Sequence, residues 1–282
     1  MTLVTTAQGP ASLWIVRHGQ SAGNVARDAA EAAALEVIAL DMRDVDVPLS
    51  ALGERQAEAL GRWFSAMPVE QRPNAVLSST YRRAHSTAQI IARVGGLAAA
   101  DIEIVCDERL REREFGVLDQ LTKAGILARH PEQAELRKRF GKFYHRPPGG
   151  ESWCDINLRL RSVIEWMARE YEGQRVLVVC HSVVVLCFRY LLERMTEDQI
   201  LEIDRETEVA NCGLTAYEYH PAAGPRSGTT GGLLLRAYNF VAPLEDAGEP
   251  VTTRPDKVRA ETAAEETPGE KAKRAQTKAS EP

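Results

Sequence analysis

The sequence predicts an α/β protein, a three-layer α/β/α sandwich around a mostly parallel sheet. Short apolar runs typical of buried strands alternate with longer segments whose apolar residues recur at helical spacing, and this alternation favours parallel strands joined by helices. The strongest strand signal is residues 175–180, which contain four consecutive aliphatic side chains. A helical stripe is formed by Leu60, Trp63, Phe64 and Met67, at positions i, i+3, i+4 and i+7.

The same patterns predict the other elements in chain order. Strands are expected at residues 13–16, 75–77, 102–106, 175–180, 214–219 and 233–238. The last two flank a loop that contains Gly224, Pro225 and Gly228, and we expect them to pair antiparallel. Helices are expected at residues 24–40, from about 50, from 80 to 94, at 120–142 with an interruption at Pro131, at 156–167 and at 184–194.

Length and composition indicate one folded domain with polar ends. The chain has 282 residues, enough for one large domain or two small ones. We predict a flexible N-terminus at residues 1–11 and a single domain at residues 12–244. Residues 245–282 lack aromatic side chains and mix Glu, Lys, Ala, Thr and Pro, so we predict a disordered charged tail there.

Composition also narrows the class of protein. The formal net charge is −5 and the body has no pronounced basic block, which argues against a nucleic-acid partner. The five cysteines include no C-x-x-C pair, so we expect neither zinc nor redox chemistry, and a reducing compartment. We find no signal-peptide pattern and no apolar stretch long enough to span a membrane. We therefore expect a cytoplasmic protein without membrane contact.

Chemically versatile side chains follow four predicted strands. Arg17 and His18 end the first strand, Arg83 follows the second, Glu112 follows the third and His181 ends the strand at 175–180. In open α/β sheets, ligands bind in the crevice outside the carboxyl ends of the strands. The sequence therefore predicts that two arginines, two histidines and a carboxylate meet at one edge of the sheet.

These residue types form a complete set for breaking a phosphate monoester. Phosphoryl transfer needs positive charge around the equatorial oxygens, and Arg17, Arg83 and a protonated His181 can supply it. His18, neutral at one ring nitrogen, can attack phosphorus and form a covalent intermediate. Glu112 can protonate the leaving oxygen and later accept a proton from water.

Two further donors are candidates for binding the phosphate. They are the side chain of Asn24 and the backbone N–H of Ser182, which is expected at a helix N-terminus. None of the remaining histidines has metal-ligand spacing, so we predict no metal and no cofactor.

The ordered motifs resemble those of the histidine phosphatase, or phosphoglycerate-mutase-like, superfamily. They span roughly residues 12–240 and occur in the family's order: Arg17-His18-Gly19-Gln20-Ser21-x-x-Asn24, Asp46-x-Pro48-Leu49-Ser50-x-x-Gly53, Ser79-x-x-x-Arg83-Ala84-x-x-Thr87-Ala88, Leu110-x-Glu112-Arg113-x-Phe115-Gly116, Gly150-Glu151-Ser152 and Val179-Cys180-His181. The resemblance implies a metal-free enzyme with His18 as the phosphorylated nucleophile and Glu112 as the proton donor. It also implies phosphate binding by Arg17, Arg83 and His181.

Within the family, residues 142–194 look most similar to the bisphosphatase half of the bifunctional fructose-2,6-bisphosphate enzymes. Lys142, Arg146 and the Gly-Glu-Ser motif carry this similarity, but Ser182 stands where those enzymes have glutamine. Phosphoglycerate mutases are similar at the core but have glycine after the second histidine. We therefore predict a phosphatase acting on a small phosphorylated metabolite, with a mutase, or a non-catalytic scaffold, as alternatives.

Some assignments stay open at this point. Arg82 competes with Arg83 for the phosphate, and Glu114 competes with Glu112 as the acid; the family pattern favours Arg83 and Glu112. The basic residues 137–139 together with Lys142 form either a solvated helix face or a second anion site. The sequence does not determine the oligomeric state, and a homodimer is one of the alternatives.

Overall fold

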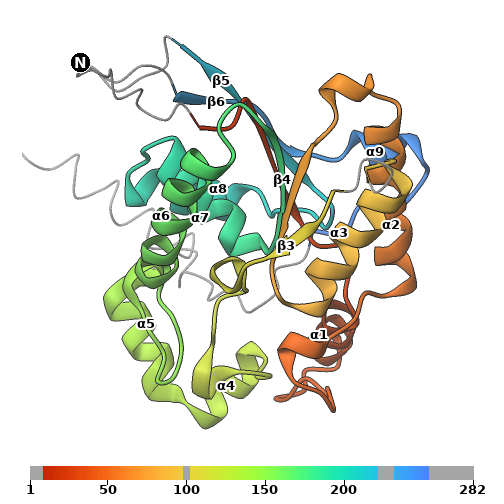
Figure 1. The fold of residues 1–282 in the computed structure, drawn as a ribbon. Helices are drawn as coiled ribbons and strands as arrows, with labels where there is room; N and C mark the ends of the chain where they lie inside the picture. Colours follow the sequence, from red (N-terminus) through yellow and green to blue (C-terminus); the bar gives the residue numbers. More distant parts are fainter. Residues whose placement is uncertain (1–8, 98–101, 222–231, 254–282) are drawn as a thin grey trace, which may run out of the picture.

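The computed structural model describes residues 9–97, 102–221 and 232–253, which form a six-stranded sheet with helices on both faces (Figure 1). The spatial order of the strands is β3-β2-β4-β1-β5-β6. Their bounds are Ser12–Arg17 (β1), Ala75–Ser78 (β2), Ile104–Cys106 (β3), Arg175–Cys180 (β4), Leu214–His220 (β5) and Gly232–Phe240 (β6). The first four strands are mutually parallel, whereas β5 pairs antiparallel with β1, and β6 pairs antiparallel with β5. The predicted sandwich with a mostly parallel sheet is confirmed.

Each face of the sheet buries its own core. Because side chains alternate along a strand, Val178 of β4 faces one core and Val179 the other. Helices α6 (Trp153–Glu170), α7 (Ser182–Leu192) and α8 (Glu197–Glu206) cover the Val178 face. Helices α2 (Ala51–Ser65), α3 (Arg82–Val94) and α9 (Ala242–Asp246) cover the Val179 face (Figure 1). These three layers hold the strand ends in fixed relative positions.

Most predicted elements recur near their expected bounds. The predicted interruption at Pro131 separates α4 (Lys123–Arg129) from α5 (Pro131–Tyr144), because proline starts a new helix where its missing N–H costs nothing. The late antiparallel pair is present as β5 and β6. The predicted loop between them lies outside the described residues, apart from its first positions. Strand β3 begins at Ile104, two residues later than predicted.

The predicted helix at residues 24–40 is wrong in its second half. Helix α1 covers only Ala22–Ala32, and Ala34 has a φ of 52°. The following segment pairs with a distant one instead: the Ile38 N–H donates to the Gln120 carbonyl (2.8 Å), and the Thr122 N–H donates to the Glu36 carbonyl (3.0 Å). Tertiary pairing therefore overrides the helical propensity of this alanine-rich stretch.

The ordered domain extends beyond both predicted boundaries. At the C-terminal side, Gln56 Nε2 donates to the Pro250 carbonyl (2.9 Å), and the Asn211 N–H donates to the Thr252 carbonyl (2.8 Å). At the N-terminal side, the Gly9 carbonyl accepts from the Gly173 N–H (2.9 Å). Residues 245–253 are attached by these polar contacts and by Val251, which packs against the core on the Val179 face, and their composition did not signal these distant contacts. The rest of the predicted tail, residues 254–282, lies outside the described residues.

Candidate active site

The two candidate histidines emerge side by side from neighbouring strands. Strands β1 and β4 are parallel with Arg17 opposite Cys180, so His18 and His181 leave the sheet at the same level. Their ring centroids are 5.1 Å apart at 63°, and both side chains are fully buried. The structure therefore brings His18 and His181 together at neighbouring strand ends.

The hydrogen bonds of His18 indicate which of its two ring nitrogens carries the proton. Nδ1 lies 2.7 Å from the Gly19 carbonyl, which can only accept, so Nδ1 carries the proton and Nε2 keeps its lone pair. Arg83 Nε donates toward that lone pair across 3.3 Å. A nucleophilic nitrogen thus faces the guanidinium group that we expect to bind phosphate.

A close backbone approach supports the loop after His18. A Cβ atom on Gly19 would lie 2.4 Å from the Gly53 carbonyl, so the loop packs directly on the start of α2. The Gln20 N–H donates to Gln56 Oε1 (2.9 Å), and the Gly19 N–H donates to Thr87 Oγ1 (3.1 Å). The glycines of the first two motifs, Gly19 and Gly53, are therefore required because any side chain there would collide with backbone atoms.

The two candidate arginines are both buried, but they differ in what holds them. Arg17 Nη1 donates to the Val209 carbonyl (2.7 Å). Arg83 Nη1 donates to the Asp44 carbonyl (2.6 Å) and lies 3.1 Å from Asp44 Oδ1, while Arg83 Nη2 lies 3.3 Å from Asp44 Oδ2. Arg82 is exposed, so the structure brings Arg83, and not its neighbour, to His18.

Glu112 lies beside His181 in the buried site. Its Oε2 atom is 3.7 Å from His181 Nδ1, and its Oε1 atom accepts from the Arg113 N–H (2.8 Å). The competing carboxylate, Glu114, is half exposed and accepts from the Tyr81 hydroxyl (2.8 Å). Burial and this carboxylate raise the pKa of Tyr81, so its hydroxyl remains protonated as a donor. Of the two glutamates, Glu112 is therefore the one that is buried beside His181.

His181 also contacts a residue that the sequence did not single out for chemistry. Its Nε2 atom lies 2.9 Å from the Ser79 hydroxyl, which stands at the end of β2. His181 is the residue before helix α7, and Ser182 is the first residue of that helix. The Ser182 N–H is therefore one of the amides at a helix N-terminus, as predicted. The position of Ser79 at a strand end was the available signal for its role.

Asn24 has a more structural role than predicted. Its Oδ1 atom accepts from the Ser21 N–H (3.0 Å) in a capping box at the start of α1, and from Asn211 Nδ2 (3.4 Å). It nevertheless lines a pocket together with Arg83. Asn24 thus shapes the site while also starting the helix that borders it.

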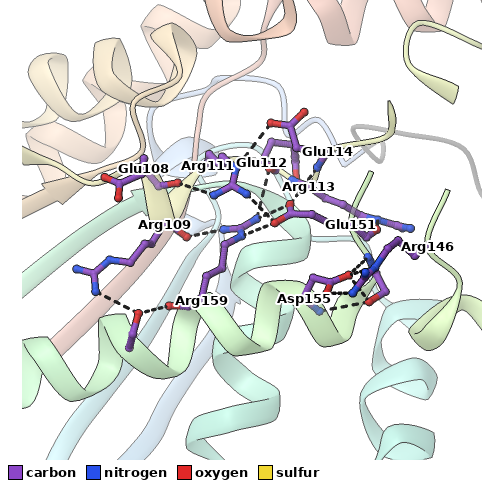
Figure 2. A network of polar contacts seen from close by, with 12 residues as sticks. Glu108, Arg109, Arg111, Glu112, Arg113, Glu114, Arg146, Glu151, Asp155 and Arg159 are labelled. Atoms are coloured by element: carbon purple, nitrogen blue, oxygen red, sulfur yellow. Dashed lines mark hydrogen bonds and ion pairs between the residues drawn. The ribbon is translucent and has the colours of Figure 1, made fainter. Parts of the chain in front are cut away.

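A network of ion pairs holds the loop that carries Glu112 (Figure 2). Glu151 accepts from Arg111 Nη2 (2.8 Å), from Arg159 Nε and Nη2 (3.0 and 3.1 Å), and from the Glu114 N–H (3.1 Å). Arg159 also donates to the carbonyls of Arg109 and, across 3.4 Å, Glu112. One carboxylate and one guanidinium therefore fix the backbone on both sides of Glu112. Glu151 was visible in the Gly-Glu-Ser motif, whereas Arg159 carried no local signal.

The basic residues near position 140 differ in their surroundings. Lys138 and Arg139 are exposed, whereas Arg137 is partly buried and lies near Lys142 and Arg113. Lys142 pairs with Asp204 of α8, and burial lowers its pKa. Arg146 pairs with Asp155. These contacts favour the solvated or structural interpretation over a second anion site.

In the described part of the chain, no three His, Cys, Asp or Glu side chains are placed to hold a metal ion. No helix among the described residues is long and apolar enough to cross a membrane.

The arrangement brings together an imidazole nitrogen with a lone pair, two guanidinium groups and a carboxylate beside the ends of the strands. The chain matches the model of the histidine phosphatase superfamily (branch 1) over residues 13–225, and it belongs to this family. The predicted family is therefore confirmed.

Two sequence relatives within the family are named as phosphoglycerate mutases. The 2,3-bisphosphoglycerate-dependent phosphoglycerate mutase 2 of Gloeobacter violaceus is 31% identical over 219 residues, which cover 76% of this chain and 88% of that protein. The mutase of Sinorhizobium fredii is 29% identical over 201 residues, which cover 70% of this chain and 87% of that protein.

Among solved structures, a mycobacterial glucosyl-3-phosphoglycerate phosphatase has a TM-score of 0.60 and 26% identity, and the match covers 81% of this chain and 98% of that chain. A putative alpha-ribazole-5'-P phosphatase from Escherichia coli shares the fold, with a TM-score of 0.62 at 20% identity over 81% and 96% of the two chains.

Proposed function

We propose that the protein is a phosphate monoester hydrolase that works through a phosphohistidine on His18. The observation that carries this proposal is the geometry of His18 Nε2: its lone pair is free of a proton and lies 3.3 Å from Arg83 Nε. A phosphoryl group bound by Arg83 is therefore presented to a nucleophile. Glu112, beside His181, is within the same buried site.

In the first half-reaction, His18 Nε2 attacks phosphorus. The N–P bond forms as the P–O bond to the alcohol breaks, and Glu112 donates its proton to the leaving alkoxide. Arg17, Arg83 and His181 stabilise the negative charge on the equatorial oxygens, with the Ser182 N–H and Asn24 as further donors.

In the second half-reaction, water attacks the phosphorus of phospho-His18. The carboxylate of Glu112 accepts the proton of this water, the N–P bond breaks, and the electron pair returns to Nε2. Inorganic phosphate leaves and the site is restored. The protein and the attacking water supply every proton and charge in this cycle, so we propose no metal and no cofactor. Activity on p-nitrophenyl phosphate is expected to persist in excess EDTA, and its loss there would contradict this part.

A mutase is the second candidate, and the names of the sequence relatives favour it. In a mutase, phospho-His18 passes its phosphoryl group to a second hydroxyl instead of water. The two functions separate in one assay: phosphate release is compared with isomer formation for 2- and 3-phosphoglycerate. We expect phosphate release to dominate. Isomer formation without phosphate release would contradict the hydrolase.

Several finer assignments remain proposals. A small phosphorylated metabolite as the substrate, a cytoplasmic location and a homodimer fit the sequence and await measurement. The resemblance of residues 142–194 to fructose-2,6-bisphosphatase domains stays a prediction, and both Lys142 and Arg146 already pair with carboxylates of the chain. A non-catalytic scaffold is disfavoured because nucleophile, acid and phosphate-binding arginines all remain.

A further inference from the structure

One hydroxyl group, that of Thr252, lies between two buried side-chain amides. Its Oγ1 atom is 2.8 Å from Asn211 Oδ1 and 3.1 Å from Gln56 Nε2. Asn211 and Gln56 are only 1% and 0% exposed, so hydrogen bonds within the protein must satisfy both amides. None of the reaction steps above uses any of these three residues.

The backbone partners of the two amides determine which way each amide points. Gln56 Oε1 faces the Gln20 N–H (2.9 Å), which can only donate, and Gln56 Nε2 faces the Pro250 carbonyl (2.9 Å), which can only accept. Asn211 Nδ2 donates to the His18 carbonyl (3.0 Å), so Asn211 Oδ1 is the atom that faces the hydroxyl. Each amide therefore contacts the loop of the nucleophile with one end and residues 250–252 with the other.

These orientations also determine the direction of the Thr252 hydroxyl. Asn211 Oδ1 carries no proton, so the hydroxyl donates to it, and the hydroxyl oxygen accepts from Gln56 Nε2. A hydroxyl group has one proton and two lone pairs, so it can bind both amides at once, whereas a methyl group can bind neither. Turning either amide around would place two donors or two acceptors against each other.

The loop that these amides hold orients the ring of His18. The Gly19 carbonyl accepts from His18 Nδ1 (2.7 Å), and this bond leaves the lone pair on Nε2. Gln56 binds the N–H of the following residue, Gln20. Asn211 binds the carbonyl of the preceding residue, His18. The backbone around the Gly19 carbonyl is therefore held on both sides.

The segment that carries Thr252 is itself attached to the domain. Glu249 Oε2 accepts from Arg55 Nε of α2 (2.9 Å), and Val251 packs against the core that α2 borders. The Thr252 carbonyl accepts from the Asn211 N–H (2.8 Å). These contacts hold the hydroxyl at a fixed place between the two amides.

We propose that Thr252 is a positioning residue: its hydroxyl fixes the two amides and, through them, the loop that orients the ring of His18. It contacts no reacting atom. The kinetic consequence rests on the hydrolase function proposed above, whereas the effect on the loop does not. A misoriented His18 ring leaves the phosphate-binding arginines in place, so the effect falls on phosphoryl transfer rather than on phosphate binding.

The first experiment removes the hydroxyl from the full chain and keeps the shape of the side chain. Thr252→Val should lower kcat/KM for p-nitrophenyl phosphate by about tenfold, which corresponds to about 1.4 kcal/mol. The loss should be equal for glycerol 3-phosphate, since both esters need attack by His18. The inhibition constant of inorganic phosphate should change by less than about twofold, because the arginines are unaffected. An unchanged kcat/KM, or a parallel rise of the inhibition constant, would overturn the proposal.

Two matched variants separate the hydroxyl from general damage to the fold. Thr252→Ser keeps the hydroxyl and should retain most of the activity. Thr253→Val makes the same change at an exposed threonine that forms no side-chain hydrogen bond within the described residues, and it should behave as the wild type. Equal losses in the two valine variants, or no recovery in Thr252→Ser, would contradict the role of the hydroxyl. If Thr252→Val does not fold, Thr252→Ala removes the same hydroxyl with a smaller side chain.

A measurement without substrate separates this inference from the proposed function. Hydrogen–deuterium exchange should show protection at Gln20 in the wild type, because its N–H donates to Gln56 Oε1. Thr252→Val should accelerate exchange several-fold in the peptide that covers residues 16–24, and Thr253→Val should not. Equal exchange in the three proteins would overturn the proposal, even in an active hydrolase. Absence of turnover in the wild type would contradict the hydrolase function, and exchange would then decide the role of Thr252 by itself.

Discussion

Two regions of the site are built in different ways. The cradle, comprising Arg17, His18, Ser79 and His181, stands on the ends of adjacent parallel strands and is fully buried. The pocket wall, comprising residues 35–44 and 119–122, joins chain segments that lie outside the sheet. The wall is held by backbone hydrogen bonds, by the contacts of Asp44 with Arg83 and by the exposed ion pair between Arg129 and Glu36 (2.9 Å).

Because of this difference, we expect the cradle to determine catalysis and the pocket wall to determine which substrate binds. The cradle is fixed by two cores and by strand pairing, so small changes at its edge leave the positions of His18 and His181 intact. Exposed ion pairs such as Arg129–Glu36 contribute only about 0–1 kcal/mol, so the wall can change without unfolding the sheet. We therefore expect substitutions in the cradle to abolish turnover and substitutions in the wall to change substrate preference.

The largest effect is expected for His18→Ala. Removing the nucleophile leaves no atom to form the covalent intermediate, so kcat should fall by at least about 10³-fold for every ester. Phosphate release from p-nitrophenyl phosphate measures this. His220→Ala, which changes an exposed histidine at the end of β5, is the control and should retain activity. Normal turnover in His18→Ala would contradict the cradle's assignment.

Glu112→Gln should show a smaller loss that depends on the leaving group. Alkyl alkoxides need a proton to leave, so kcat for glycerol 3-phosphate should fall by about 10²- to 10³-fold. p-Nitrophenolate leaves without protonation, so the loss for p-nitrophenyl phosphate should be below about tenfold. Steady-state kinetics with both esters measures the contrast. Equal losses would show that Glu112 acts other than as the acid.

Glu151→Gln tests the network that holds Glu112. Losing the charge weakens the bonds from Arg111 and Arg159, so the loop should shift and kcat for alkyl esters should fall by about tenfold. The loss for p-nitrophenyl phosphate should be smaller, as for Glu112→Gln. Glu218→Gln, which weakens an exposed pair with Arg236, is the control. A uniform loss for both esters would indicate general damage to the fold.

The last prediction concerns the stability of the fold against pH, rather than activity. Burial and the neighbouring Arg137 and Arg113 lower the pKa of His145 to about 4. Because the unfolded state binds this proton near pH 6.5, the protein should lose up to about 3 kcal/mol as the pH falls from about 6.5 to about 4. Urea unfolding at pH 7.5 and 5.5 measures the change. His145→Gln should flatten this dependence; an equal slope in both proteins would contradict it.

The sequence could predict the cradle because each of its residues directly follows a strand that the sequence pattern indicates. An Arg-His or Cys-His pair directly after a strand pattern can be recognised from the sequence alone as a candidate site residue pair. Parallel strands bring such strand ends together. Arg83 and Glu112 were found the same way, each just after a strand. The preference for Arg83 over Arg82 needed the family pattern, and the structure supplies its physical reason in burial.

The pocket wall could not be predicted because its contacts are distant in sequence. Asp44 meets Arg83 across 39 positions, and nothing near Asp44 signals that contact. The alanine-rich stretch after Ala32 favours helix locally, yet its residues pair with Gln120 and Thr122. Arg159 likewise reaches Glu112 from the middle of α6. In each case, packing between remote segments decides the structure.

The most direct test of the account is chemical quenching of the wild-type protein during turnover of a phosphate ester labelled in its phosphoryl group. The account predicts label bound to the protein that is lost in acid, survives in base and maps by peptide analysis to His18. His18→Ala should carry no label. Turnover without any such phosphoprotein, or label on a residue other than His18, would contradict the central claim.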